Sequence, residues 1–258
     1  MTWSVYAVRY AGRTADADEY FLSRQRDMSG PQDMAYYVWV AVRGDRVVLV
    51  DTGWNEGSAT KRGRDPGDPL DVALGAVGVS PADVTDVVLT HLHYDHGGNI
   101  DLLPNARLHL QRAELEFWQS DVGKRRYFAL AVEEDDVAAA ARAAADGRCA
   151  LHTGDYEIVP GVTAHLVRGH TPGMQVVRVA AGDQSVVLAS DAVHTTHNLE
   201  RDMPSRTLVD PVEMLLGFDH IRSLASSDKL VIPGHDGRVL QEFEPADRAL
   251  AGRAVRIV

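Results

Sequence analysis

Four side chains that commonly bind metal ions are packed into the run HLHYDH: His91, His93, Asp95 and His96. Imidazole and carboxylate suit zinc and neighbouring divalent ions, whereas softer metals prefer thiolates. Cys149 is the only cysteine, so a thiolate-rich site is excluded. The Gly97–Gly98 pair follows directly and lets the backbone bend and approach a neighbouring segment closely. Histidine makes up only 11 of 258 residues, so three of them within six positions would rarely occur together by chance. The cluster therefore predicts half of a two-metal site.

The residues before the cluster predict how it is presented. Residues 84–90 (VTDVVLT) are rich in β-branched and apolar side chains, which is typical of a strand. Alternate positions of an extended chain point the same way, so His91 and His93 can reach one metal ion together. Asp95 and His96 come after the chain starts to turn, so we expect them to point elsewhere.

A two-metal site needs further ligands, and three candidates follow other predicted strands. His170 lies in GHTPG, Asp191 follows VVLAS, and His235 follows KLVIPG. Each alone could be an ordinary turn, cap or loop residue. Their shared position after a strand predicts that they meet the HLHYDH cluster at one edge of the sheets, where a carboxylate could bridge two cations with its two oxygens. Structural or surface roles are expected for His109, His152, His165 and His220.

Composition limits the other classes of function. With 45% apolar and 24% charged residues, the chain of 258 residues is expected to be a soluble globular protein, and we interpret residues 1–258 as a single domain. The net charge of −11 disfavours binding to a nucleic-acid backbone. The N-terminal residues lack a basic segment followed by an apolar run, and no apolar stretch approaches the roughly 20 residues of a membrane span. We therefore expect a cytoplasmic location and no membrane partner.

Strands and helices alternate in two similar halves, which indicates a layered α/β sandwich. Strands are predicted over residues 4–10, 36–42, 46–51, 84–90 and 107–111, then over 156–159, 162–167, 174–180, 185–189 and 229–232. Helices are predicted over residues 70–77, 113–120, 133–146 and 212–224. The helix over 133–146 is rich in alanine and could be a lid, although packing through its Val and Ala face is the favoured reading.

Two segments are predicted to be loops. Residues 15–34 form a polar stretch between strands that is too long for a hairpin turn, and long loops of this kind are often functional. Residues 61–69 (KRGRDPGDP) are charged and contain several helix and strand breakers, so a surface loop is expected.

The set HLHYDH, GHTPG, SDA and GHD resembles the metallo-β-lactamase superfamily. The resemblance implies a four-layer αββα sandwich with a dimetal site at one edge of the two sheets. Asp51 in VLVDTGW matches an early aspartate of that superfamily, which supports the metal loop without binding metal. The stretches THLHYDHGGN, LQRAELEFW, GDYEIVPGVTAHLVRGHTPGMQ and SDAVHTTHNLE look most like the N-acyl homoserine lactone lactonases, the quorum-quenching lactonase family.

The resemblance also implies a ligand set and a reaction. His91, His93 and His170 would hold one divalent ion, Asp95, His96 and His235 the other, with Asp191 between them. Zinc is the first expectation, and iron, cobalt and manganese fit the same donors. A metal-bridging hydroxide would attack the carbonyl of a lactone such as an N-acyl homoserine lactone, and Asp95 would pass a proton to the departing ring oxygen.

A further catalytic candidate and a substrate pocket follow from the same comparison of residues. Many lactonases of this kind have a tyrosine three residues after the bridging aspartate, and His194 stands at that position here. His194 could donate a hydrogen bond to the substrate, or it could pack beside the site without a role. Apolar walls for the substrate are expected from Tyr20, Phe21, Met28, Trp54, Phe117 and Trp118, with core packing as the alternative for most of them.

Other activities on this fold stay open as alternatives. A thioesterase of the glyoxalase II type, or a lactonase for a catabolic lactone, would use the same ligands. A β-lactamase is disfavoured because no export signal is recognised, and a diiron oxidoreductase because it prefers a carboxylate at the position of His93 and needs a flavin domain. A nuclease is disfavoured by the acidic charge. The expected partner is a small lactone or ester-like substrate, and a homodimer stays open.

Overall fold

Long strands that alternate between two apolar faces build the centre of the molecule. The computed structural model describes residues 2–25, 27–28 and 30–258. In β2 (Pro31–Arg43), Tyr36, Val38 and Val40 face one apolar cluster. Tyr37 and Trp39 face another cluster on the opposite side of the strand. A strand with two apolar faces must be covered on both sides, which places it inside a layered structure.

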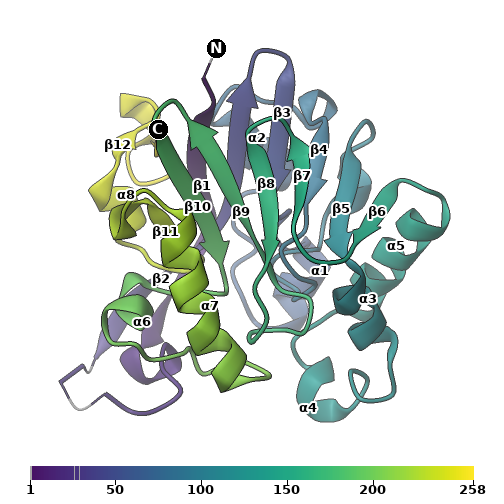
Figure 1. Ribbon diagram of the computed structural model, residues 1–258, viewed down its shortest axis with the longest axis vertical. Coiled ribbons are helices and arrows are strands. Elements are labelled where there is room, and N and C mark those ends of the chain that lie inside the picture. The colour runs from purple at the N-terminus through teal and green to yellow at the C-terminus, as the bar shows by residue number, and fades with distance from the viewer. Residues whose placement is uncertain (1, 26, 29) are drawn as a thin grey trace.

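Two sheets lie face to face (Figure 1). The first runs in the order β12-β13-β1-β2-β3-β4-β5-β6 and the second in the order β11-β10-β9-β8-β7. Besides β2, the first sheet contains β1 (Ser4–Asp16), β3 (Arg46–Val50), β4 (Asp86–Val88), β5 (Arg107–Gln111), β6 (Cys149–His152), β12 (Glu244–Pro245) and β13 (Ala254–Arg256). The second contains β7 (Tyr156–Val159), β8 (Val162–Leu166), β9 (Gln175–Ala181), β10 (Gln184–Ser190) and β11 (Val231–Pro233).

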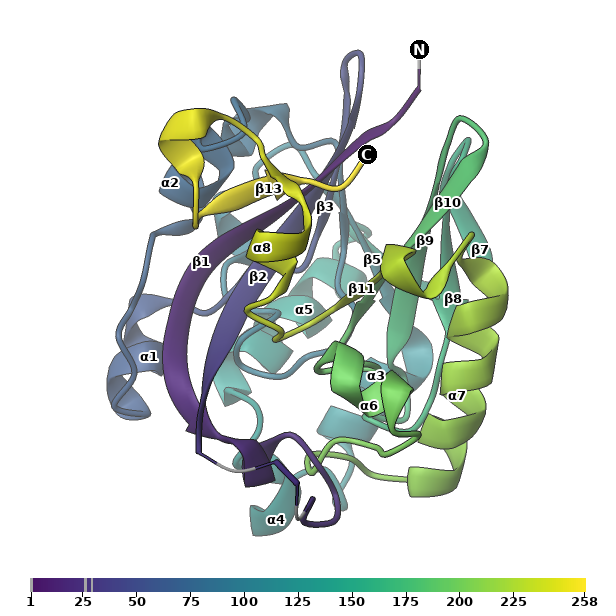
Figure 2. The same ribbon diagram turned by 90° about the vertical axis from the view of Figure 1, so that its left-hand side faces the viewer.

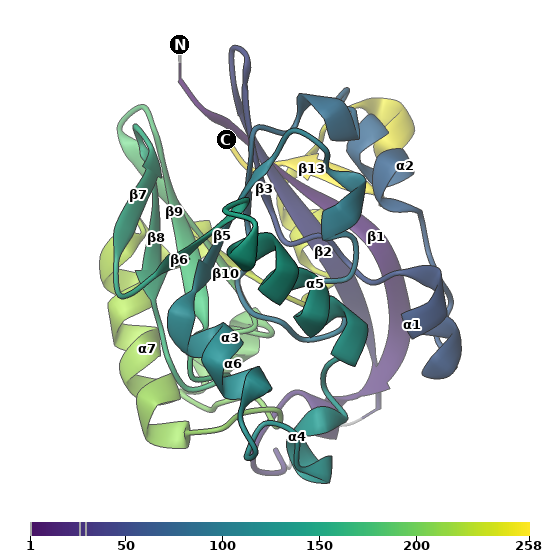
Figure 3. The same cartoon turned by 90° about the vertical axis from the view of Figure 1, so that its right-hand side faces the viewer.

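Helices cover the outer faces of both sheets (Figures 2 and 3). The first sheet is covered by α1 (Glu56–Lys61), α2 (Leu70–Gly75), α3 (Arg112–Gln119) and α5 (Glu134–Ala145), and the second by α6 (Thr196–Glu200) and α7 (Pro211–Leu224). The short helices α4 (Arg126–Ala129) and α8 (Val239–Glu242) lie at the margins. Among the described residues, no helix is long and apolar enough to span a membrane.

Three apolar clusters separate the four layers. One lies between the first sheet and its helices, one between the sheets, and one between the second sheet and α7. This arrangement confirms the predicted four-layer αββα sandwich. The predicted helices over 70–77, 113–120, 133–146 and 212–224 correspond to α2, α3, α5 and α7.

The prediction of a long loop over residues 15–34 is wrong at both ends. β1 continues to Asp16, which pairs with Pro31 at the start of β2, and the short 3-10 helix Ala17–Glu19 follows. The polar side chains that suggested a loop satisfy one another at the surface instead: Arg9 pairs with Asp33, and Arg13 with Glu19. A strand with one solvated face need not be apolar, so composition alone did not reveal the extension.

The alanine-rich helix is a packing helix and not a lid. α5 buries Val137, Ala140 and Ala143 in the cluster beside the first sheet, and none of its residues lines the cavity described below. The lid alternative for residues 133–146 is therefore wrong. A helix with a small apolar face lies flat against a sheet because alanine allows close approach.

Phe218 tests how much the outer helix of the second sheet contributes to stability. Its side chain is fully buried between α7 and the second sheet, so we expect Phe218→Ala to lower the free energy of unfolding by about 3–5 kcal/mol. Leu216 on the same helix is 60% exposed, and Leu216→Ala should stay within about 0.5 kcal/mol of the parent. Urea denaturation measures both, and equal losses for the two variants would contradict this packing.

Candidate metal centre

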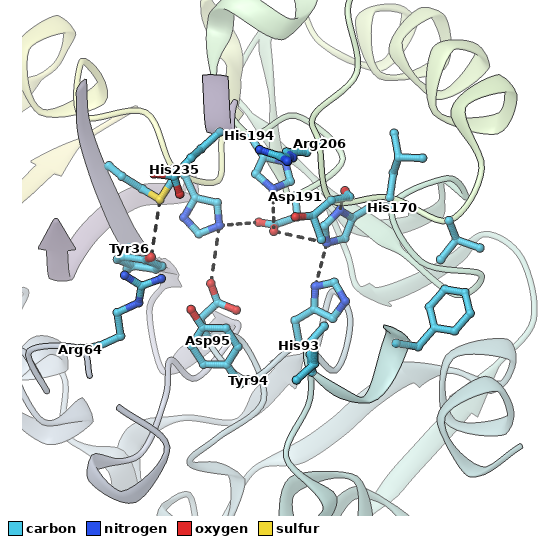
Figure 4. Close-up of a pocket in the computed structure, with 18 of the residues that line it drawn as sticks. Tyr36, Arg64, His93, Tyr94, Asp95, His170, Asp191, His194, Arg206 and His235 are labelled. Carbon is cyan, nitrogen blue, oxygen red and sulfur yellow. Dashed lines mark hydrogen bonds and ion pairs between the residues drawn. The ribbon is translucent and has the colours of Figure 1, made fainter. Parts of the chain in front are cut away.

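The ends of several strands converge on one edge of the two sheets (Figure 4). In the first sheet β3 and β4 are parallel, and in the second sheet β10 and β11 are parallel. Asp51 follows β3, the HLHYDH run follows β4, Asp191 follows β10, and His235 lies two residues beyond β11. Parallel neighbours finish at the same edge, so the chain order that the sequence suggested becomes a spatial cluster.

The first group of candidate ligands contains three imidazoles and one carboxylate. Nε2 of His170 lies 3.2 Å from Nε2 of His91 and 2.9 Å from Nδ1 of His93. The same Nε2 atom lies 3.3 Å from Oδ2 of Asp191. The four residues are buried, and their ligand atoms all lie within 4.8 Å of one another. They could hold a metal ion together.

The second group lies beside the first. Oδ2 of Asp95 lies 3.7 Å from Nε2 of both His96 and His235. The other oxygen of the neighbouring Asp191, Oδ1, lies 3.2 Å from His96 Nε2 and 2.9 Å from His235 Nε2. Asp191 therefore turns one oxygen toward each group, which is the arrangement that a bridging carboxylate requires.

Outer contacts fix the orientation of three of these histidine rings. Nδ1 of His170 donates to the carbonyl oxygen of Thr207 at 2.8 Å, and Nδ1 of His235 donates to that of Ala35 at 2.9 Å. Nδ1 of His96 lies 2.8 Å from the carboxylate of Asp51. A ring that donates through Nδ1 presents the lone pair of Nε2 to the site, as metal-binding histidines do.

The electrostatics of the first group favour uncharged imidazole. Burial lowers the pKa of His93 and of His170 to about 3, and burial together with the neighbouring rings lowers the pKa of His91 well below its usual value. Neutral imidazole is the form that binds metal. In the second group, burial also lowers the pKa of His96, but the carboxylates of Asp191, Asp95 and Asp51 outweigh it and raise that pKa. That part of the site therefore attracts positive charge.

Unpartnered atoms show that a divalent cation fits between these residues. Nε2 of His96 and Oδ1 of Asp191 are buried and make no hydrogen bond with the described residues. Buried polar atoms without partners are uncommon because each costs free energy. Lone pairs of nitrogen and oxygen that converge on one another without a hydrogen between them are satisfied by a cation.

Asp51 supports the metal loop from behind, in the position that the family resemblance assigned to it. Its carboxylate accepts hydrogen bonds from the backbone N–H of Thr90 and from the hydroxyls of Thr90 and Ser190. Asp51 and Ser190 have φ angles of 61° and 45°, a region that non-glycine residues rarely adopt. Asp51 directly follows β3 and Ser190 is the last residue of β10. The strained backbone therefore lies where the chain leaves each sheet and enters the site.

The two glycines after the cluster have different roles. A Cβ atom at Gly98 would lie 2.8 Å from the carbonyl oxygen of Gly53 and 2.9 Å from the backbone nitrogen of Asn55, so only glycine fits. A Cβ atom at Gly97 would meet Leu92 Cδ2 at 3.4 Å, an ordinary contact. The expected close approach is therefore found at Gly98 and not at Gly97.

Glu114 is a buried supporting residue that the sequence analysis missed. Its Oε1 accepts from the Leu92 backbone N–H at 2.9 Å and from Trp118 Nε1 at 2.7 Å. Its Oε2 accepts from the Thr171 hydroxyl at 2.6 Å and from the Gly173 backbone N–H at 3.0 Å. One carboxylate on α3 thus joins the loop that carries His91 and His93 to the loop that carries His170. No local pattern marks it, since a Glu in a helix is usually exposed.

His194 lies where the family comparison placed it, beside the bridging carboxylate. Its Nε2 is 3.3 Å from Oδ2 of Asp191, and its Nδ1 is buried without a partner among the described residues. Burial lowers the pKa of His194 to about 3, so the ring is neutral. His194, Asp191 and His235 also form a third set whose ligand atoms lie within 4.8 Å of one another.

A cavity of about 470 Å³ opens over the two groups and is lined by His93, Asp95, His170, Asp191, His194 and His235 among others. Of the predicted wall residues, Trp118 lines it. Tyr20 and Met28 line a separate cavity of about 210 Å³ near Asp236, so their assignment to this pocket is wrong. Both residues lie in the segment between the end of β1 at Asp16 and the start of β2 at Pro31, which packs beside Asp236 and not over the two ligand groups.

The remaining predicted wall residues pack behind the cavity. Phe21 is 2% exposed in the core, and Trp54 is buried behind Tyr36 and stacks on Tyr94 with ring centroids 5.9 Å apart. Phe117 packs against Phe128, which does line the cavity. Among the described residues that line the two cavities, none of Phe21, Trp54 and Phe117 appears, so these three assignments are corrected to core packing.

Four of the other histidines form two clusters, and His197 pairs with Glu200 on α6. His109 is buried, lies 3.1 Å from Asp86 and 3.1 Å from His152, and is structural as expected. His165 and His220 lie near the surface, as expected, but they converge with Asp155, which the sequence did not indicate. Their ligand atoms and that of Asp155 lie within 4.8 Å of one another at the surface. No motif marks this cluster because α7 and the β7–β8 region meet only in the folded chain.

Comparisons with known proteins identify the family and the fold of this chain. The profile of the metallo-beta-lactamase superfamily matches residues 31–236. The N-acyl homoserine lactonase AiiA of Bacillus thuringiensis subsp. kurstaki is 28% identical over 205 residues, covering 73% of this chain and 76% of that protein. The N-acyl homoserine lactonase AttM of Agrobacterium fabrum is 30% identical over 184 residues, covering 67% of this chain and 66% of that protein.

Two solved structures show the same fold. An N-acyl homoserine lactone hydrolase with N-hexanoyl-L-homoserine at its catalytic metal centre superposes with a TM-score of 0.72 at 22% identity, covering 95% of this chain and 98% of that one. The dizinc quorum-quenching lactonase AidC superposes with a TM-score of 0.71 at 18% identity, covering 90% of this chain and 87% of that one.

Metal removal should destabilise the folded chain. A ligand that binds only the folded state stabilises it by about 4 kcal/mol at a thousand times its dissociation constant. We therefore expect a chelator to lower the melting temperature by roughly 10 °C and added Zn²⁺ to restore it. Metal analysis should find two ions per chain, and fewer in Asp191→Asn, whose parent carboxylate faces both groups. An unchanged melting temperature on chelation of metal-loaded protein would contradict a structural metal centre.

Glu114 should be essential to the position of the metal loop. Glu114→Ala leaves four donors without their acceptor, so we expect a loss of roughly 3–5 kcal/mol in unfolding free energy and weaker metal binding. Glu116→Ala, on the exposed face of the same helix, is the matched control and should change neither property. Urea denaturation and metal titration of both variants measure these two properties. If Glu114→Ala changes neither the unfolding free energy nor metal binding, Glu114 does not support the metal loop.

Proposed function

We propose that this chain, which belongs to the metallo-β-lactamase superfamily, is a dinuclear metal-dependent hydrolase that opens a lactone ring. The observation that carries the proposal is the bridging position of Asp191, with one oxygen toward each group of histidines. We propose zinc for both positions because imidazole and carboxylate suit it and AidC, a structural neighbour, is a dizinc lactonase. N-acyl homoserine lactones are the proposed substrate class, since AiiA and AttM are N-acyl homoserine lactonases.

Three histidines would hold one ion, and Asp95, His96 and His235 the other, with Asp191 shared. When bound, two divalent ions supply an activated water and polarise a carbonyl group. That chemistry needs no serine or cysteine nucleophile. Residues 1–258 would act as one hydrolase domain, because each group takes ligands from both halves of the chain. Cytoplasmic location stays a prediction.

Asp95 is the proposed proton carrier. It lines the cavity, and burial raises the pKa of its carboxyl group despite the nearby His96 and His235. A carboxylate that lies beside the second metal position and faces the cavity can pass a proton to a departing ring oxygen. Opening of the lactone breaks the ring C–O bond, adds the water oxygen to the carbonyl carbon, and leaves a hydroxy acid.

His194 is the proposed hydrogen-bond donor to the substrate. A neutral imidazole carries one N–H, and His194 lines the cavity beside Asp191. Its ring therefore could donate to the carbonyl oxygen or to the ring oxygen of a bound lactone. A donor aimed at developing negative charge acts mainly on turnover.

A hydrolysis panel tests the proposed reaction. Metal-analysed protein is assayed by pH-stat with homoserine lactones of several acyl lengths, simple γ- and δ-lactones, aromatic lactones, and thioesters including a glutathione thioester. We expect lactones to be opened and thioesters to be hydrolysed much more slowly. Thioester turnover without lactone turnover would replace the proposal with a glyoxalase II type thioesterase, and opening of simple lactones alone would indicate a catabolic lactonase.

Substitution of His194 separates a catalytic role from packing. We expect His194→Ala to lower kcat by about 100-fold with a small change in KM and unchanged metal content. His194→Tyr should recover most of kcat, because a phenol also donates a hydrogen bond. If both variants turn over substrate like the parent, His194 only packs beside the site; if His194→Ala loses metal, it is a ligand instead.

A further inference from the structure

Arg64 places a guanidinium in the cavity wall without an ion pair among the described residues. It is half-buried and lines the cavity with Tyr36, Tyr94 and Asp95 (Figure 4). Its Nε atom is buried without a hydrogen-bond partner, and among the described residues no carboxylate lies within 4.0 Å of its guanidinium. The Tyr94 hydroxyl lies beside the guanidinium, whose charge helps to lower the pKa of Glu19, but no carboxylate is paired with it. The guanidinium therefore keeps donors for an anionic ligand.

The neighbouring arginines show that partners are available in this region. Arg13, which also lines the cavity, is paired with Glu19, and Arg62 is paired with Glu133. The chain has 37 acidic and 26 basic residues, so a free arginine is not explained by a shortage of carboxylates. Arg64 is the exception among these three arginines.

The backbone holds Arg64 in this position. Helix α1 ends in a Schellman motif: Gly63 has a φ of 62° and donates to Thr60 O, and the N–H of Arg64 donates to Ala59 O at 2.9 Å. The run KRGR therefore ends the helix and places Arg64 directly after the left-handed glycine. A rigid attachment lowers the entropy that the side chain loses when it binds an anion.

A second arginine lines the same cavity from the other half of the chain. Arg206 is exposed and makes no ion pair with the described residues. Figure 4 draws Arg206 near His194 and Arg64 near Tyr36, at different parts of the cavity wall. Apart from the metal-binding groups and the paired Glu19, the lining offers guanidinium groups, the hydroxyls of tyrosines such as Tyr94, and apolar side chains such as Leu130. This wall would favour an anionic group on one part of the substrate.

We propose that the substrate is a lactone that carries a carboxylate, and that Arg64 binds this carboxylate while the ring lies at the metal centre. A planar guanidinium donates two parallel hydrogen bonds to a carboxylate, which a neutral amide cannot accept in the same way. The inference rests on the proposed lactonase function and narrows its substrate to a lactone with a carboxylate on the acyl chain or on the ring, in place of an uncharged N-acyl homoserine lactone. The product of ring opening is then a dicarboxylate that bears a hydroxyl group.

Two matched pairs of lactones test this assignment. One pair is N-glutaryl homoserine lactone and its terminal carboxamide, and the other is 5-oxotetrahydrofuran-2-carboxylate and its carboxamide. In each pair the shape is kept and the charge is removed. For at least one pair we expect the metal-loaded parent to show about a 10- to 100-fold higher kcat/KM for the charged lactone, mainly through KM, with a preference that falls as salt is added.

The variants are Arg64→Met, Arg64→Lys and, as a matched control, Arg107→Met. Arg64→Met should bring the two members of the preferred pair to equal kcat/KM without slowing the neutral lactone, and Arg64→Lys should restore part of the difference. Arg107 is exposed on β5, does not line the cavity, and its variant should behave like the parent. Metal content and melting temperature confirm that each variant is folded and loaded.

The outcomes separate the two proposals. If the parent opens neutral and charged lactones equally in both pairs, or if Arg64→Met keeps the preference, Arg64 does not bind a substrate carboxylate and the lactonase proposal stands. If the loaded parent opens no lactone at all, the proposed function fails and this inference fails with it.

Discussion

The molecule depends on the burial of two carboxylates and several imidazoles against one another at the edge of two sheets. Asp95 and Asp191 are almost fully removed from water, and so are the rings around them. Buried charges of this kind are stable only with an opposite charge close by. Three features hold these groups close together: strands that end at the site, outer hydrogen bonds that orient the rings, and strained backbone at Asp51 and Ser190.

The same requirement explains which parts of the fold the sequence revealed. The ligand types are rare and closely spaced in HLHYDH, and His170, Asp191 and His235 each follow an apolar strand, so their convergence could be predicted from local patterns. The layered fold followed from alternating strands and amphipathic helices. Residues 15–34 were misread because the outer ends of β1 and β2 are polar, and ion pairs such as Arg13–Glu19 replace the apolar pattern that identifies a strand.

The walls of the cavity could not be predicted in the same way. Tyr127, Phe128 and Leu130, which lie in or beside the short helix α4, line the cavity, whereas aromatic residues such as Trp54 and Phe21 belong to the core. An aromatic side chain looks the same in sequence whether it packs or binds. Glu114 and Arg64 were missed for a related reason, since the importance of each depends on what is, or is not, within hydrogen-bond distance after folding.

Each ligand group takes side chains from both sheets. His91 and His93 follow a strand of the first sheet, whereas His170 and Asp191 follow strands of the second, and the other group combines Asp95 and His96 with His235 in the same way. Each bound ion would therefore be a cross-link between the two sheets, closing long loops of the chain as a disulfide does. Without the ions, the apolar layer between the sheets and backbone bonds such as those from Ala35 to His235 and from Gln175 to Thr90 join the two halves. Metal binding would then add a second tie between the two sheets, at the edge where the ligand groups lie.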